Sequence, residues 1–209
     1  MQKLYGKLKM NWITVLVFAL ITGIYTGIMM CIPILENTSF QDIGPFYEWW
    51  VIFAVIIVVN CKKNWEAALK CFVFFLLSQP LVYLTEVVFG HLTMDMAIYY
   101  YFNFWLKPTF LTLPGGFIAY YCKKQNVLGS IILGLGNTIQ ACMGVYYLAN
   151  TIRSFPHHIL SAIVAFGSIF IMSIYIQKER KNQIIAIALP CVLVLVILVL
   201  CMLTGRTLF

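Results

Sequence analysis

Charged residues are scarce in this chain, and acidic residues are the scarcest. Of 209 residues, 7 are Asp or Glu and 14 are Lys or Arg, so charged residues make up 10% of the chain. Soluble domains carry about 25% charged and about 45–50% apolar residues, whereas 62% of this chain is hydrophobic. A soluble fold of this size has too little interior to bury so much apolar surface. The composition excludes a soluble domain, a disordered chain and a secreted disulfide scaffold.

The common catalytic and metal-binding signatures are also missing. The sequence has no HExxH, no G-x-S-x-G, no Walker A and no DxxD-type acid pair that would hold Mg²⁺. Its 7 cysteines include no CxxC pair and lie mostly in apolar runs, where cysteine behaves as a small hydrophobe. His91, His157 and His158 are scattered in loops, which is weak evidence for a metal. We therefore expect no metal, no cofactor and, on balance, no enzyme.

Seven apolar runs are long enough, or nearly so, to cross a bilayer, which takes about 20 residues of helix. They lie near residues 12–34, 45–60, 65–89, 100–121, 127–148, 159–176 and 184–203. The run 45–60 is short, so six spans are the alternative. Pro108 and Pro114 predict a bend in the fourth run, or an interfacial helix up to Leu106 followed by a shorter span. The prediction is an all-α polytopic membrane protein with a single transmembrane domain over residues 1–209.

The basic residues predict the orientation of these spans and explain the formal net charge of +7 without nucleic acid. A cytoplasmic N-terminus places eleven of the 14 basic residues in the inside loops, as the positive-inside rule requires. The excess of lysine over arginine and the plentiful isoleucine favour an AT-rich bacterial genome, and we expect the chain to lie in the cell membrane. The same polarity allows two three-helix bundles joined by the fourth span. The inside residues are Lys3, Lys7, Lys9, Lys62, Lys63, Lys70, Lys123, Lys124, Lys178, Arg180 and Lys181.

The span 127–148 carries small and polar residues at helical spacing. Ser130, Gly134, Asn137, Ala141 and Gly144 recur at steps of four and three, which places them on one face. Small residues let another helix approach closely. The simpler interpretation is a packing seam within the chain or toward other membrane subunits. The alternative is that Asn137 and Gln140 also face a cavity. The run 184–203 offers little besides aliphatic residues and is expected to be peripheral and lipid-facing.

Polar residues in the third span make a second candidate site. Pro80 frees a backbone carbonyl one turn earlier, and a bend with Gln79 beside it could form a polar niche. Glu86 is ionisable within a span, which is a functional hypothesis by default, although it could also reach water at the outer end. Glu66 and Lys70 are four residues apart near the start of this span, and we expect them to pair.

The fourth span supplies a cation and aromatic residues. A buried Lys107 would need a carboxylate or an aromatic face, and Glu86 is the nearest candidate, with Asp95 second. The aromatic stretch that holds Tyr101 and Trp105 is typical of an interfacial belt. Alternatively it forms a stacking wall for a substrate, with Glu48, Trp49 and Trp50 opposite.

These features predict a small multipass transporter or a substrate-binding transport subunit, with an outward-facing site for a small solute. The chain resembles small substrate-binding membrane subunits of bacterial uptake systems in size and hydrophobicity, though not in motif. The alternatives are a lipid-modifying membrane enzyme that uses Glu86 or His91, and an assembly subunit. The expected partners are membrane lipid, a small solute and other membrane subunits. The predicted substrate-binding residues are Glu48, Gln79, Glu86, Tyr101, Trp105, Lys107, Asn137 and Gln140.

Overall fold

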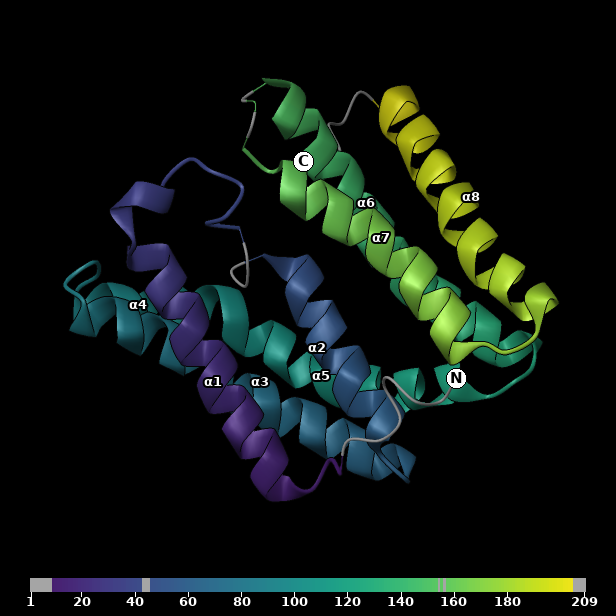
Figure 1. Ribbon diagram of the computed structural model, residues 1–209, viewed down its shortest axis with the longest axis horizontal. Coiled ribbons are helices and arrows are strands. Elements are labelled where there is room, and N and C mark those ends of the chain that lie inside the picture. The colour runs from purple at the N-terminus through teal and green to yellow at the C-terminus, as the bar shows by residue number, and fades with distance from the viewer. Residues whose placement is uncertain (1–8, 43–45, 154, 156, 205–209) are drawn as a thin grey trace. The chain divides into compact units, whose positions relative to one another are not determined.

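The computed structural model describes residues 9–42, 46–153, 155 and 157–204 (Figure 1). In these ranges all regular secondary structure is helical. Five helices are long and apolar enough to cross a membrane, which supports a helical membrane protein. They are α1 (Trp12–Cys31), α3 (Asn64–Val88), α6 (Val127–Arg153), α7 (Ile159–Ile176) and α8 (Arg180–Thr204).

The other helices are shorter, so the seven spans expected from the sequence stay a prediction. The apolar helix α2 has 14 residues, fewer than a straight crossing needs. The start predicted for it, Pro45, lies outside the described residues. The short elements are η1 (Pro33–Leu35), α2 (Tyr47–Asn60), α4 (Met94–Tyr100), η2 (Tyr101–Trp105), α5 (Leu106–Ala119) and η3 (Tyr120–Lys123).

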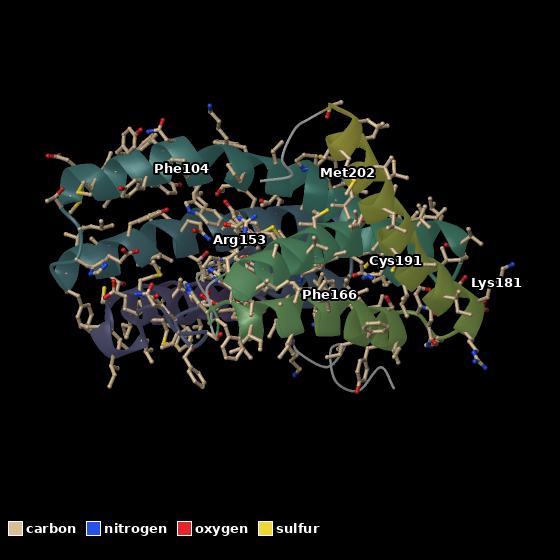
Figure 2. All side chains as sticks on the ribbon, turned by 90° about the horizontal axis from the view of Figure 1, so that it is seen from above. Phe104, Arg153, Phe166, Lys181, Cys191 and Met202 are labelled. Atoms are coloured by element: carbon tan, nitrogen blue, oxygen red, sulfur yellow. The ribbon has the colours of Figure 1, made fainter. Side chains whose placement is uncertain are left out.

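The fourth predicted span begins earlier than expected. Thr93 caps the helix through its side chain, which accepts a hydrogen bond from the Met96 N–H, so the helix starts at Met94 and not near Tyr100. Figure 2 shows α4, η2 and α5 as one continuous helical run. Pro108 has no N–H for the Phe104 carbonyl. Just before it, η2 is a π turn, in which the Leu106 N–H donates to the Tyr101 carbonyl.

The chain divides into two compact units. Among the described residues, the N-terminal unit comprises those up to Tyr120, and the C-terminal unit those from Tyr121 onward. The fourth helical run packs on α3 and belongs to the N-terminal unit, so it is not a free linker between two bundles. The single transmembrane domain stays a prediction.

Helix α3 is the centre of the N-terminal unit and packs against α1, α2 and α5. Its closest neighbour is α1, because Gly23 and Gly27 bring no side chain to the contact. A Cβ on Gly23 would lie 2.7 Å from the Ser78 carbonyl oxygen, and one on Gly27 would lie 2.6 Å from the Val82 carbonyl oxygen. This G-x-x-x-G spacing is a common device for close helix packing in membranes. In the same unit, Phe18, Trp50 and Phe74 form an aromatic core.

A buried lysine joins the start of α1 to α3. Lys70 is 3% exposed, and its Nζ donates to the Met10 carbonyl and to Glu66 Oε1 at 2.5 Å. The Trp12 ring lies 5.6 Å from the same Nζ. The expected pairing of Glu66 with Lys70 is therefore confirmed. The carboxylate of Glu66 compensates the buried positive charge of Lys70, which would be costly to bury alone.

In the C-terminal unit, α6 packs against both α7 and α8, and the three helices lie side by side in Figure 1. The small-residue face expected on α6 is confirmed as a packing seam, because all five of its residues are buried. Gly134 meets Leu189 of α8, and Gly144 meets Phe166 of α7. The peripheral position expected for the last helix is also supported, since α8 buries only one narrow face, at Asn182, Ala186, Pro190 and Val194.

Candidate functional site

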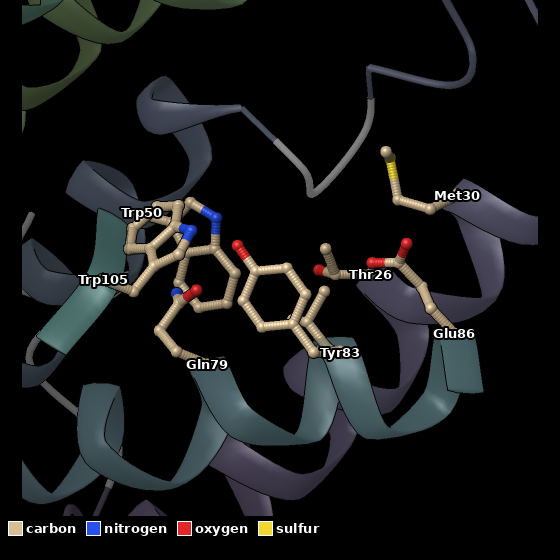
Figure 3. A pocket seen from close by; sticks show the side chains of 8 residues that line it. Thr26, Met30, Trp50, Gln79, Tyr83, Glu86 and Trp105 are labelled. Carbon is tan, nitrogen blue, oxygen red and sulfur yellow. The ribbon is translucent and has the colours of Figure 1, made fainter. Parts of the chain in front are cut away.

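The N-terminal unit contains a cavity of about 100 Å³ between its helices (Figure 3). Three helices and the π turn contribute to its wall. The lining residues are Thr26 and Met30 of α1, Trp50 of α2, Gln79, Val82, Tyr83 and Glu86 of α3, and Trp105 of η2.

The α3 wall follows from helical spacing. Gln79, Val82, Tyr83 and Glu86 are separated by three, one and three residues, which places them on one face of the helix. The close approach of α1 at Gly27 brings the neighbouring Thr26 to that face. A larger residue in place of Gly27 would hold the two helices apart.

One end of the cavity is aromatic. The ring centroids of Trp50 and Trp105 are 6.1 Å apart, and the Trp105 ring also lies 5.2 Å from that of Tyr47. The indole N–H of Trp105 donates to the Tyr83 hydroxyl. In Figure 3 the two indoles lie beside the Gln79 amide, and the Tyr83 hydroxyl points toward them. The indoles and the Tyr83 ring give the cavity rigid aromatic walls.

The other end of the cavity is polar and acidic. Figure 3 shows the Glu86 carboxylate near the Thr26 and Met30 side chains. Glu86 is 5% exposed, and the basic group with which it interacts electrostatically is the exposed His91 beyond the end of α3. The lining includes no lysine or arginine. Its ionisable carboxylate therefore has no cationic residue in the cavity wall.

Two lining side chains have polar atoms without a hydrogen-bond partner. The Gln79 Nε2 and the Thr26 Oγ1 are both buried and unbonded, and each residue is 1% exposed. A buried polar group without a partner typically costs about 1–3 kcal/mol. Unbonded donors beside a cavity are groups that a bound molecule could satisfy.

No family model, curated protein or solved structure matches this chain. The chemistry of the cavity is therefore the guide to its function.

Three of the eight residues predicted from the sequence, Gln79, Glu86 and Trp105, line this cavity together. Tyr101 is half-buried on η2 and lies against Phe102, outside the lining. Glu48 is fully buried in the first turn of α2 and does not reach the cavity either.

The expected pairing of Lys107 with Glu86 is wrong. Lys107 is exposed, and the structure contains no ion pair between the two. Tyr83 lies against Tyr100, and Phe72 against Phe110, so α3 and the fourth helical run are antiparallel with a defined register. In this register Lys107 is displaced from Glu86 along the helix axis by about ten residues, or about 15 Å. The error follows from starting the fourth helix six residues too late.

Asn137 and Gln140 belong to the C-terminal unit and do not line the cavity. The Asn137 Nδ2 donates to Ser173 Oγ at 2.9 Å and to the Ala186 carbonyl at 3.1 Å. That carbonyl lacks its usual helical donor because the residue four positions later is Pro190. Asn137 therefore replaces a hydrogen bond that proline removed. Gln140 is fully buried one turn further along α6.

Sequence reasoning missed four lining residues: Thr26, Met30, Val82 and Tyr83. The spacing from Gln79 to Glu86 already places Val82 and Tyr83 on the same helical face. The Gly23 and Gly27 pair also signals that α1 packs closely on another helix. Nothing in the sequence shows that this helix is α3.

Proposed function

We propose that this chain is a small multipass membrane transporter or a substrate-binding transport subunit, and that its cavity binds a small solute. The observation that supports this most directly is the combination of a cavity between helices with the unbonded Gln79 Nε2 and the Glu86 carboxylate in its wall. Ionisable residues within membrane spans often mark substrate or ion pathways. Aromatic walls with a few polar groups are also the usual lining of a small-molecule site.

A lipid-modifying enzyme is the second candidate, and we do not favour it. Acid–base chemistry would need a second titratable group near Glu86 in the cavity, whereas the described lining offers only Tyr83, whose hydroxyl is bonded to Trp105. An assembly subunit is the third candidate. Its strongest support in the sequence was the small-residue face of α6, which packs within the chain against α7 and α8.

The proposal includes seven spans with a cytoplasmic N-terminus in a bacterial cell membrane. Helix α2 and the continuous run from α4 to α5 would add two spans to the five long helices. Cysteines introduced in a cysteine-free background test this topology. Glu36→Cys should react with an impermeant maleimide on intact cells, while Lys63→Cys, Lys124→Cys and Lys181→Cys should not. Outside labelling at Lys63 would remove α2 as a span.

Ligand-induced stabilisation tests the solute site. The purified chain in detergent should show a higher melting temperature with at least one member of a panel of amino acids, amines, carboxylates and sugars at 10 mM. Trp105→Leu should abolish this shift. The control is Phe104→Leu, which also replaces an aromatic ring with leucine, at an exposed neighbour outside the lining. A panel without any shift, or a shift that survives Trp105→Leu, would overturn the proposal.

A further inference from the structure

We propose that the solute is a small organic cation, an amine or quaternary ammonium that carries one hydrogen-bond-accepting oxygen. This inference rests on the proposed solute site and specifies its chemistry. Three properties of the cavity lead to it: its charge, its aromatic walls and its free donor.

The first property is charge. Glu86 is the acidic residue of the lining, and no lysine or arginine accompanies it. Lys107, which the sequence suggested as its partner, is exposed. The antiparallel register of α3 and the fourth helical run separates it from Glu86 by about 15 Å along the helix axis. Elsewhere in the same unit a buried cation does receive a carboxylate, as Lys70 does from Glu66. The protein places no cationic side chain beside Glu86 in the cavity wall, since its electrostatic partner His91 is exposed beyond the end of α3. The side of the carboxylate that faces the cavity therefore suits a cation on the solute.

The second property is the aromatic wall. Trp50, Tyr83 and Trp105 surround the space that extends from Glu86 toward α2. Aromatic faces attract cations through the quadrupole of the ring, and tryptophan does so most strongly. An anionic solute would meet both a carboxylate and the negative faces of these rings. The lining therefore disfavours carboxylates and phosphates as ligands.

The third property is the free donor at the far end from Glu86. The Gln79 Nε2 lies beside the indoles, is unbonded and is a donor, so it calls for an acceptor on the solute. An ammonium at Glu86 and an oxygen at Gln79 would satisfy both ends. A volume of about 100 Å³ suits a small molecule. Ethanolamine and choline each combine a positively charged nitrogen with one hydroxyl oxygen.

The decisive experiment compares two isosteres on the wild-type chain. Choline and 3,3-dimethylbutan-1-ol have the same shape and the same hydroxyl, and differ in the charged nitrogen. Calorimetry and thermal shifts in detergent should show that choline or ethanolamine binds at least tenfold more tightly than the neutral alcohol. No variant is needed, so misfolding cannot obscure the result.

Variants then locate the charge. Glu86→Gln should reduce the affinity for the bound cation at least tenfold and bring it close to that of the neutral alcohol. Asp95→Asn removes the same charge from an exposed position outside the lining and should change the affinity less than twofold. Cation binding that is unchanged in Glu86→Gln would overturn the inference.

The outcomes separate this inference from the proposed function. If the neutral alcohol, a sugar or a carboxylate binds as tightly as the cations and requires Trp105, the solute site stands and the cation class is wrong. If no solute in either panel binds, both fail.

Discussion

The two units use buried amides in different ways. In the C-terminal unit, the Asn137 amide bonds a hydroxyl and the carbonyl that Pro190 leaves without a donor. In the N-terminal unit, Gln79 also stands next to a proline within a helix, yet its Nε2 is unbonded and lies in a cavity wall. Unbonded buried atoms occur in both units, and Asn137 Oδ1 is one of them. What distinguishes a candidate site is therefore the coincidence of an unbonded donor with open space.

The largest effect is expected where the N-terminal unit depends on close packing. Gly27→Leu would force α1 away from α3, because even a Cβ would lie 2.6 Å from the Val82 carbonyl oxygen and from Thr85 Cβ. Overpacking of this kind costs about 1–3 kcal/mol and occasionally more. We expect a loss of about 3 kcal/mol in the free energy of unfolding, measured by detergent denaturation. Gly115→Leu is the control, since nothing lies within 4 Å of its Cβ position. Equal losses for the two variants would contradict the close contact.

The second prediction tests the structural role of Asn137. Asn137→Ala should lower the free energy of unfolding by about 1–2 kcal/mol, because it leaves the Ala186 carbonyl without a donor. In a Pro190→Ala background, residue 190 regains an N–H for that carbonyl. The Asn137→Ala loss should then fall by about half. A double-mutant cycle without coupling would show that the amide does not compensate for the proline.

Gln79 should respond in the opposite way. Gln79→Leu removes an amide whose Nε2 has no partner, so we expect a change within about 0.5 kcal/mol in the free energy of unfolding. Binding of the solute should nevertheless be lost, as measured by the ligand-induced shift in melting temperature. A loss of stability as large as that of Asn137→Ala would mean that Gln79 is a packing residue, and the contrast between the units would disappear.

The smallest effect concerns the turn before α6. Cys122 is 4% exposed, and burial raises the pKa of its thiol to about 12. The thiolate is the reactive form, so maleimide at pH 8 should label Cys122 only after denaturation. Lys124→Cys, at an exposed position two residues later, should be labelled in the native chain. Native labelling of Cys122, followed by mass spectrometry, would show that this end of the C-terminal unit opens to solvent.

Local signals predicted the helices well because they depend on short stretches of sequence. The uncharged run after Asn11 and the run 159–176 became helices with nearly the expected bounds, and the spacing of Glu66 and Lys70 was enough to predict their ion pair. The small-residue face of α6 was likewise predicted by helical periodicity.

The candidate site was only partly predictable because it depends on which helices meet. Gln79, Glu86 and Trp105 were identified one at a time as unusual residues in apolar spans. Lys107 was misplaced because the Thr93 cap was not recognised. A helix start that is set too late shifts the expected register of all later residues against α3. Thr26 and Met30 look ordinary in the sequence and acquire a role only through the packing of α1 on α3.

The position of Trp105 in the cavity wall depends on the number of residues in the π turn η2. A π turn holds one more residue than an α-helical turn would, and such turns occur frequently at functional sites. Its last residue, Trp105, is half-buried in the cavity wall, whereas the adjacent Phe104 is exposed. Loss of one residue here would rotate the following side chains by about 100° against α3, so descendants of this chain could keep every lining residue and still lose the site.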